Sequence, residues 1–233
     1  PLNKKKHYIY YGIHGGTQWP GIASTPTGII IIPSNNIAYR VKLKDPDDFN
    51  LKKEFKNMLL DILNIEFGSF KLFKSSVKKV LKRKNLILNY KQPNIEGWTK
   101  FENDDGIPLN NPPWGVLAAI DIKNKKKKWV VPHGSYPVLK NIDFETGSEI
   151  FGSPIILSSG IIFMSGTDDQ KIRAYSLEEG ELIWEDNLPY SSYGSLVIGE
   201  YNERQFLIVN TSGGTNFNSS PGDAIVAYEL VKK

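Results

Sequence analysis

The sequence contains no cysteine and only three histidines and two methionines among its 233 residues. Without cysteine the chain can form no disulfide and offers no thiolate ligand to a metal ion. The histidines, His7, His14 and His133, show no zinc-site spacing such as His-x-x-x-His. No apolar run approaches the roughly 20 residues that a membrane-spanning helix needs. The sequence therefore argues against a disulfide scaffold, a zinc site and a helical span in this chain.

The chain does contain enough apolar material for a sizeable core, since 40% of its residues are hydrophobic. Its length corresponds to one large or two small domains. The net charge is a modest +4, and a composition without cysteine suits an oxidising compartment. The first residue is Pro1 instead of methionine, so we expect the chain to begin after processing or inside a longer protein.

Two stretches of the chain follow one pattern, and each ends on a tryptophan. "VLAAIDIKNKKKKW" ends at Trp129 and "KIRAYSLEEGELIW" ends at Trp184. Each is typical of an alternating strand, a tight turn and a second strand. Aligning the tryptophans places Gly180 in the second turn, where a positive φ angle costs little, opposite Lys125 in the first.

Further strand-like runs surround these repeats. "GSPIILSSGIIFMSGTDD" precedes the second copy, so that four strands in a row close on a tryptophan. "GIASTPTGIIIIPSNNIAYRV" from Gly21 and "DAIVAYEL" up to Leu230 resemble partial copies of the same plan. Four strands per unit at a period of roughly 50–60 residues indicate a β-propeller, in which Trp129 and Trp184 would pack between neighbouring blades. An ordinary β-sandwich is the alternative.

The strand pattern is interrupted between residues 45 and 92. Asp45, followed by a proline, predicts the start of a helix whose apolar residues recur at helical spacing. After Gly68 a second helical stretch has one apolar face and one face of lysine and arginine without any acid. The sequence thus predicts a blade segment over 1–44, a basic helical insertion over 45–92 and further propeller blades over 93–233.

The basic face of the predicted insertion leaves three interpretations open. The lysines are solvated on the outside of the propeller, dock on an anionic membrane surface, or contact another partner. Nucleic acid is disfavoured, because the aromatic residues lie on the apolar side and not among the lysines.

Four stretches recur in an order and spacing that is typical of one known family. They are "GGTQWPGIASTPTGIIII", "NPPWGVLAAIDIKNKKKKWVVP", "FGSPIILSSGIIFMSGTDDQKIRAYSLEEGELIWEDNLP" and "FLIVNTSGGTNFNSSPGDAIVAYEL". Together they resemble the C-terminal part of the quinoprotein dehydrogenases that depend on pyrroloquinoline quinone (PQQ), most closely the membrane-bound glucose dehydrogenase type. The predicted insertion is the part that does not match well.

The resemblance implies an all-β fold, a partial β-propeller of roughly three to four blades out of eight. It implies PQQ and calcium as cofactors, an aldose or alcohol as substrate and a membrane quinone as electron acceptor. The family's aspartate base, its cofactor-binding lysine and its calcium ligands lie in earlier blades, so we expect no catalytic or metal-ligating residue here and no activity of this chain alone. The implied location is the periplasm, with an inner-membrane anchor in a part that precedes the chain.

Trp114 is the first candidate for contact with the cofactor. The repeat already supplies its docking ring at Trp129, so a second tryptophan so close in the sequence needs another role. Two prolines before Trp114 restrict the loop, which suits a side chain held in one pose.

Four further candidates rest on the resemblance. Gln18 and Trp19 match the polar residue and the tryptophan of the family's Gly-Gly-Thr-x-Trp segment, although Asn or an acid is commoner where Gln18 stands. Gly213 and Gly214 match a Gly-Gly loop near the cofactor entrance. The paired acids that follow Thr167 are interpreted as a turn between two strands.

Two function classes compete. The first is part of a PQQ-dependent dehydrogenase. The second is a non-catalytic propeller of the same repeat that acts as a protein-binding scaffold in the cell envelope. A scaffold needs the docking tryptophans but no extra ones, so "GTQW" and "PPWG" favour the dehydrogenase. A propeller of the kelch or a similar type is disfavoured, because its signatures for each blade are absent from the sequence.

Overall fold

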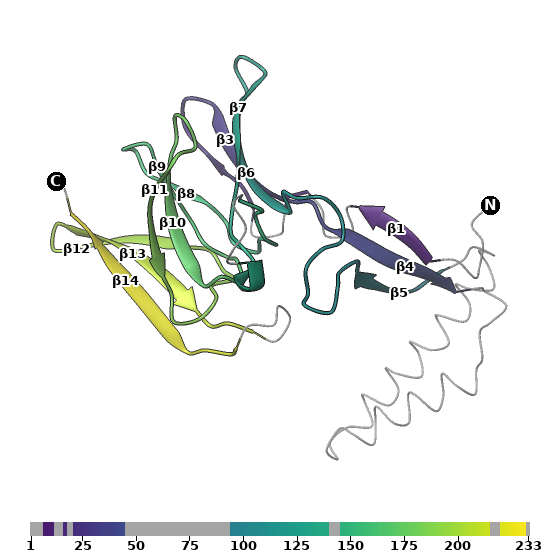
Figure 1. Cartoon of the computed structure of the whole chain (residues 1–233). Coiled ribbons are helices and arrows are strands. Elements are labelled where there is room, and N and C mark those ends of the chain that lie inside the picture. Colours follow the sequence, from purple (N-terminus) through teal and green to yellow (C-terminus); the bar gives the residue numbers. More distant parts are fainter. Residues whose placement is uncertain are drawn as a thin grey trace, which may run out of the picture. The chain divides into compact units, whose positions relative to one another are not determined.

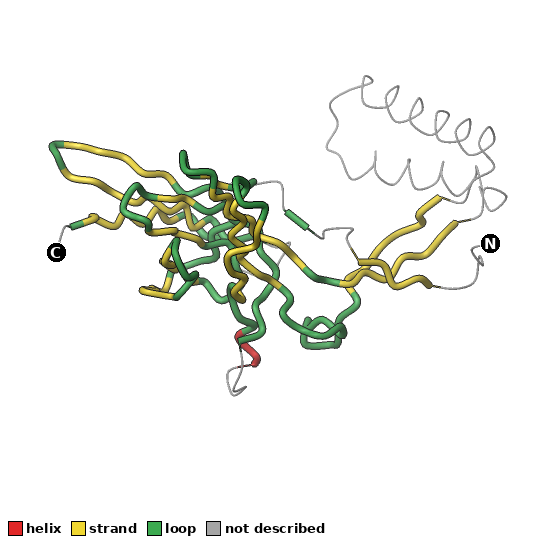
Figure 2. The backbone as a smooth tube through the Cα atoms, turned by 90° about the horizontal axis from the view of Figure 1, so that it is seen from above, coloured by secondary structure: helices red, strands yellow, loops and turns green. Residues whose placement is uncertain are grey.

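The computed structural model describes residues 7–11, 16–17, 21–44, 94–139, 145–214 and 220–231. The chain divides into two compact units, Pro1–Ile9 with Arg40–Thr99 and Tyr10–Tyr39 with Lys100–Lys233. The described residues form strands and loops, and their only helical element is the short 3-10 turn η2 (Pro137–Leu139) (Figure 1; Figure 2). None of them forms a helix long and apolar enough to cross a membrane. The predicted all-β class is confirmed.

An antiparallel sheet of four strands forms the first blade of the larger unit. Its order is β2 (Ala23–Ser24), β3 (Ile29–Asn35), β6 (Gly115–Asp121) and β7 (Lys126–Pro132). β3 pairs with β6 along its whole length, from Ile29 opposite Asp121 to Asn35 opposite Gly115. Accessibility alternates along both strands, which is the period of two that a sheet with one buried face requires. Residues from either side of the predicted insertion therefore complete one sheet.

This pairing corrects the interpretation of the stretch from Gly21. The sequence suggested that the copy runs on into Ala38 and Tyr39. Instead it ends at Asn35, and β4 (Ala38–Lys44) joins another sheet, between β1 (His7–Tyr11) and β5 (Asn94–Lys100). The first blade is thus split between its second and third strands. The predicted helical insertion over 45–92 lies outside the described residues, and the domain boundaries stay a prediction.

The second blade repeats the first without interruption. Its strands are β8 (Ile155–Ile156), β9 (Ile161–Met164), β10 (Lys171–Ser176) and β11 (Leu182–Asn187), in the sheet order β11-β10-β9-β8. The register shifts just after Ala174 here and just after Ala119 in the first blade. Lys125 and Gly180 both adopt positive φ angles, 52° and 75°. The alignment on the tryptophans is therefore confirmed even in the turn, where lysine replaces glycine in a left-handed conformation.

A third sheet follows, with the order β12 (Val197–Tyr201), β13 (Arg204–Thr211) and β14 (Ala224–Leu230). The turn between β12 and β13 consists of Asn202 and Glu203, with φ angles of 50° and 63°. Two central residues with positive φ are typical of the turn that matches the twist of a hairpin.

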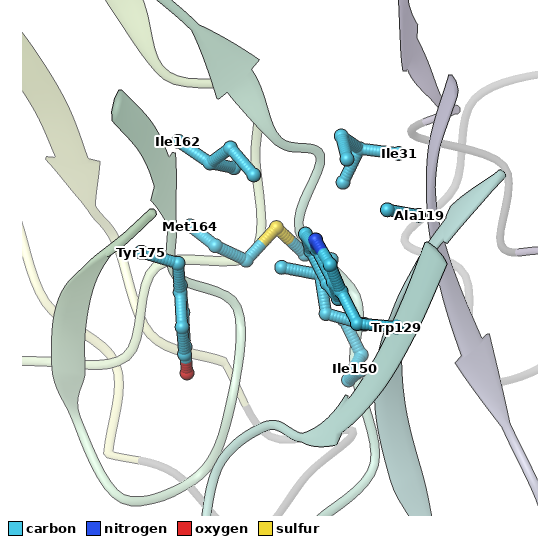
Figure 3. Close-up of a cluster of buried hydrophobic side chains, with 8 residues drawn as sticks. Ile31, Ala119, Trp129, Ile150, Ile162, Met164 and Tyr175 are labelled. Atoms are coloured by element: carbon cyan, nitrogen blue, oxygen red, sulfur yellow. The ribbon is translucent and has the colours of Figure 1, made fainter. Parts of the chain in front are cut away.

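One hydrophobic cluster fills the space between the first and second blades (Figure 3). Trp129 belongs to it and is 9% exposed. Its indole Nε1 donates a hydrogen bond to the carbonyl of Leu177 in the next blade, at 3.1 Å. A Cβ at position 180 would lie 2.7 Å from the indole ring, so Gly180 is required by packing as well as by its φ angle. Trp129 thus packs between neighbouring blades, as predicted.

Trp184 occupies the equivalent place toward the third sheet. Its ring stands edge-to-face against Phe163 and Tyr228, with ring centres 6.3 and 5.3 Å away. It remains 39% exposed, so it packs between sheets as predicted but buries far less of its surface than Trp129.

Candidate functional site

The three sheets of the larger unit each present long loops at one end. In the first sheet this end is marked by two strand pairs, Asn35 opposite Gly115 and Val116 opposite Pro132. The corresponding loops of all three sheets are here called the loop face, which comprises residues 101–114, 133–139, 145–154, 165–170, 188–196, 212–214 and 220–223.

Hydrogen bonds join these loops across neighbouring sheets. The side-chain amide of Asn35 donates to the carbonyl of Ile150 at 2.9 Å and accepts from its N–H at 2.8 Å. The N–H of Phe151 donates to the carbonyl of Gly166 at 2.8 Å. Such paired backbone groups fix the loops, because an unpaired buried polar group is costly.

Trp114 lies on the loop face and is 5% exposed. Its indole Nε1 donates to the carbonyl of Asn110 at 2.7 Å, and its ring stands edge-to-face against Tyr136 with the ring centres 5.4 Å apart. Ile37 and Tyr39 complete this buried cluster. Trp114, for which the repeat predicted no packing role, is therefore packed in a buried cluster, and its contact with a cofactor stays a prediction.

A buried carboxylate lies on the same face. Glu149 forms an ion pair with Lys100 and accepts a hydrogen bond from the hydroxyl of Tyr39 at 3.3 Å. Burial, together with the charge of Glu149, raises the pKa of Tyr39 well above its usual value. The two partners offset the cost of removing the carboxylate from water.

The acidic pair predicted to form a turn lies in the loop between β9 and β10, and its two members differ in environment. Asp168 accepts a hydrogen bond from the hydroxyl of Tyr193 at 2.6 Å. Burial raises the pKa of Asp168 to about 6, against the opposing effect of that hydrogen bond. For Asp169 burial acts in the same direction, but the hydrogen bonds and charge of Arg173 outweigh it, so the pKa of Asp169 is lowered.

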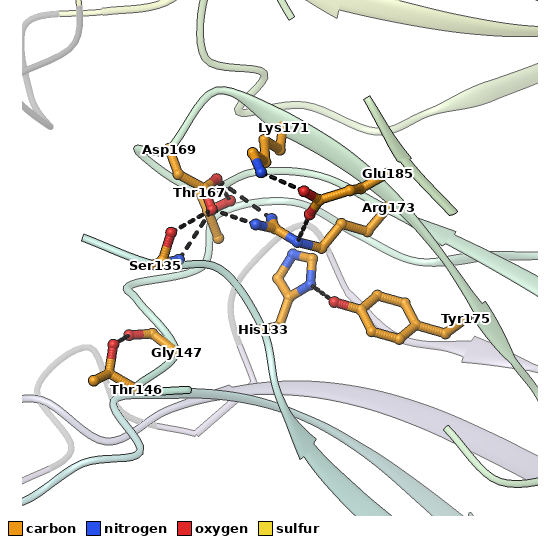
Figure 4. A network of polar contacts seen from close by, with 10 residues as sticks. All are labelled: His133, Ser135, Thr146, Gly147, Thr167, Asp169, Lys171, Arg173, Tyr175 and Glu185. Atoms are coloured by element: carbon orange, nitrogen blue, oxygen red, sulfur yellow. Dashed lines mark hydrogen bonds and ion pairs between the residues drawn. The ribbon is translucent and has the colours of Figure 1, made fainter. Parts of the chain in front are cut away.

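Asp169 is the centre of a polar network between the first two blades (Figure 4). It accepts hydrogen bonds from both the N–H and the hydroxyl of Ser135 at 3.0 Å, and from Thr167 at 2.6 Å. Arg173 pairs with Asp169 and, through Nε, with Glu185 at 3.3 Å. A cavity of about 650 Å³ lies beside this network and is lined in part by Ser135 and Arg173. The two hydrogen bonds from Ser135 tie the loop after the first blade to the second blade, to which Asp169, Thr167 and Arg173 all belong.

Three buried side-chain polar atoms have no hydrogen-bond partner in the part of the chain that the structure describes. They are Nε2 of His133, Oγ of Ser148 and Oγ of Ser191. The other ring nitrogen of His133, Nδ1, lies 2.9 Å from the hydroxyl of Tyr175. Burial, with the charge of Arg173, lowers the pKa of His133 to about 3, so the ring is neutral at ordinary pH.

Gly213 and Gly214 also lie on the loop face. The N–H of Gly213 donates to the carbonyl of Ser191 at 2.9 Å. Its φ angle is 57°, and a Cβ there would lie 1.9 Å from the carbonyl oxygen of Ser220. A side chain at position 213 is therefore excluded, whereas a Cβ at Gly214 would meet nothing within 4 Å.

The structure thus brings three of the five predicted site residues to one face, namely Trp114, Gly213 and Gly214. Gln18 and Trp19 lie outside the described residues. Sequence reasoning missed Glu149 and its partners. The available signal was a lone acid inside the otherwise small or apolar run "GSEIFGS".

These residues fit one wall of a site for a planar, multiply charged cofactor. They offer a rigid base that contains the packed ring of Trp114, and the hydroxyls of Ser148 and Ser191, which lack partners among the described residues and are the kind of polar contact that such a site needs. Among the described residues, the cations on or beside the face are Lys100, Lys171 and Arg173, and all three already pair with carboxylates. Among the described residues no group of three or more acids or histidines could hold a metal ion.

Comparison with known proteins identifies the family. Residues 1–207 match the family model described as the glucose/ethanol/alcohol dehydrogenase β-propeller domain of the PQQ proteins. The chain belongs to this PQQ β-propeller family. The predicted resemblance is therefore confirmed.

Curated relatives of this PQQ propeller are dehydrogenases. It is 30% identical over 136 residues to the quinoprotein glucose dehydrogenase of Escherichia coli (strain K12), covering 56% of this chain and 17% of the relative. It is 25% identical over 239 residues to the glycerol dehydrogenase large subunit of Gluconobacter thailandicus, covering 99% of this chain and 30% of the relative. The chain thus spans less than a third of the length of these relatives.

A solved structure supports the fold. The quinohemoprotein alcohol dehydrogenase from Comamonas testosteroni superposes with a TM-score of 0.56 at 16% identity, over 97% of this chain and 28% of that one. The predicted partial propeller is confirmed by this likeness together with the family match. The family match and the curated relatives favour the dehydrogenase over the scaffold.

Proposed function

We propose that this chain supplies several blades of a PQQ-dependent dehydrogenase that oxidises an aldose or alcohol and passes the electrons to a quinone. The observation that carries the proposal is the family match over residues 1–207. Relatives named as glucose and glycerol dehydrogenases support a hydroxyl-bearing substrate. The chemistry that bound PQQ supplies is the acceptance of two electrons from the substrate carbon.

The loop face is the surface of this chain that would border the cofactor. Trp114, which is 5% exposed, would support this wall from beneath, held in place by its hydrogen bond to Asn110 and its contact with Tyr136. Gly213 and Gly214 would line the entrance, where the absence of side chains lets the backbone approach closely. The Lys100–Glu149 pair, being internally neutralised, would keep this wall polar without adding net charge.

The remaining parts of the machinery are assigned to protein outside this chain. We expect calcium, its ligands and the aspartate base there, a periplasmic location, and a membrane quinone as the acceptor. The lysine-rich stretch within residues 45–92 stays a proposed membrane contact that the described residues do not test.

The direct experiment measures dehydrogenase activity of the whole protein that contains this chain. With added PQQ and calcium it should oxidise glucose, glycerol or another polyol and reduce an artificial electron acceptor, and it should be inactive without PQQ. A scaffold would show no PQQ-dependent turnover with any of these substrates, and that result would refute the proposal.

A second experiment uses residues 1–233 alone. We expect weak PQQ binding in a titration followed by tryptophan fluorescence, because Lys100 and Arg173 are already paired and unable to neutralise the cofactor's carboxylates. Tight, calcium-dependent binding of PQQ would place the complete site within this chain and contradict the proposal that the calcium ligands lie outside it.

A further inference from the structure

The turn between β6 and β7 concentrates positive charge at the end of the first blade opposite the loop face. We call residues 122–128 the lysine turn; it contains Lys123 and four consecutive lysines from Lys125 to Lys128. β6 runs from Gly115 at the loop face to Asp121 at this end, and the hairpin ends in a free loop (Figure 1). The surface is therefore separate from the proposed cofactor wall, and the inference does not rest on the proposed function.

Little of this charge is neutralised within the described part of the chain. Lys128 pairs with Glu178 of the next blade at 2.9 Å. Asp121 is occupied by the N–H and the side-chain amide of Asn124, at 3.0 and 2.8 Å. The other four lysines form no ion pair with any described residue, and all four are exposed.

The equivalent turn of the second blade shows that the fold does not demand these lysines. When the tryptophans are aligned, Lys123 corresponds to Glu178, Lys125 to Gly180 and Lys126 to Glu181. Both turns have the same register shift and the same left-handed residue. The same hairpin geometry thus carries opposite charges in adjacent blades. The geometry of the turn therefore does not explain the lysines of the first blade.

We propose that the lysine turn docks on the surface of an anionic lipid bilayer. Clusters of four to eight basic residues on one exposed element are the charge pattern that anionic headgroups attract. All five charges are lysines, whose flexible point charges suit a diffuse layer of lipid phosphates, whereas bidentate recognition of a single phosphate or carboxylate favours arginine. Ile122 beside them is 51% exposed and offers an apolar side chain to the interface.

The experiment is flotation of residues 1–233 with vesicles of phosphatidylcholine, with and without phosphatidylglycerol. The test variant combines Lys123→Gln, Lys125→Asn, Lys126→Gln and Lys127→Gln; asparagine retains the left-handed backbone at position 125. The matched control replaces Lys4, Lys5, Lys6 and Lys233, which lie outside both basic stretches of the sequence, by glutamine and so removes the same net charge. Circular dichroism confirms that both variants remain folded.

We expect the wild-type chain to float only with the anionic vesicles and to be released as salt shortens the screening length from about 10 Å at 0.1 M to about 3 Å at 1 M. The test variant should bind at least about tenfold more weakly, and the control variant should bind nearly as well as the wild type. Equal loss in both variants would show that binding follows net charge alone and would overturn the proposal. Binding to single-stranded DNA but not to the anionic vesicles would assign the lysines to nucleic acid and overturn it as well.

Discussion

Trp129 and Trp184 hold equivalent places in the repeat, and the structure predicts that their removal has unequal cost. Trp129 is 9% exposed and donates a hydrogen bond to Leu177, whereas Trp184 is 39% exposed. Truncation of a fully buried tryptophan to alanine costs about 3–5 kcal/mol of unfolding free energy. Trp129→Ala should lie in that range, and the lost hydrogen bond leaves the Leu177 carbonyl without its donor. Trp184→Ala should cost about 1–3 kcal/mol, since less area is lost and water fills the partly open site.

The assay is urea unfolding of the full chain, followed by circular dichroism and extrapolated linearly to zero urea. Trp98→Ala is the matched control, because Trp98 is 52% exposed and its loss should cost under about 1 kcal/mol. Trp129→Phe separates the two contributions, for it keeps a ring against Gly180 but lacks the donor, and should cost about 1–2 kcal/mol. If Trp184→Ala proves as destabilising as Trp129→Ala, burial does not determine the docking energy and the reasoning is wrong.

Two further predictions concern the loop face. The pKa of Asp168 is about 6 in the folded chain against a usual 3.8. Ionisation therefore opposes folding, and this cost develops as the pH rises from about 4 to about 6. The variant Asp168→Asn can still accept the hydrogen bond from Tyr193. Its unfolding free energy should equal that of the wild type near pH 4 and exceed it by up to about 3 kcal/mol at pH 7. A constant difference in unfolding free energy across this pH range, measured by urea titration, would contradict the raised pKa of Asp168. Trp114→Ala should destabilise the cofactor-free chain by about 3–5 kcal/mol and Trp114→Phe by about 1–2 kcal/mol, because the side chain is 5% exposed and its indole N–H is hydrogen-bonded. If both variants and the wild type have equal midpoints of thermal unfolding, Trp114 is not part of the core.

The repeat predicted the blades because each strand carries its own signal. The alternation of apolar residues and the recurring tryptophan are local in sequence, and they marked both Trp129 and Trp184. Even the left-handed turn was aligned correctly at Lys125, although lysine gives no hint of a positive φ angle. The degree of burial was not predictable, since it depends on what the next sheet places against the ring. Gly180 lies close against the ring of Trp129, while Trp184 has an edge-to-face contact with Tyr228 and stays 39% exposed.

The polar part of the candidate site was mostly beyond sequence reasoning. Glu149, Lys100 and Tyr39 are far apart in the chain and form no motif, and only the closure of the loops brings them into contact. The acidic pair was correctly placed in a turn, but its division into two environments depends on neighbours that sequence cannot supply. Asp169 forms an ion pair with Arg173, four residues later in the chain. Asp168 instead accepts a hydrogen bond from Tyr193, which lies in the loop between β11 and β12.

The split blade explains why the repeat was harder to recognise at the start of the chain than in its middle. The interruption falls between Asn35 and Gly115, which are direct partners in the sheet. Strand pairing across a long connection is tolerated, because the entropic cost of closing a loop grows only with the logarithm of its length. Asn35 also bonds to Ile150 by both its amide donor and its acceptor, which anchors the junction from the neighbouring loop. The connection departs after Asn35 and returns before Gly115, at the end of the sheet away from the contact of Trp129 with Leu177, so the hydrophobic contacts between the blades are left unchanged. An insertion at the opposite end, where Trp129 meets Leu177 and Gly180, would instead have disrupted the packing that holds the blades together.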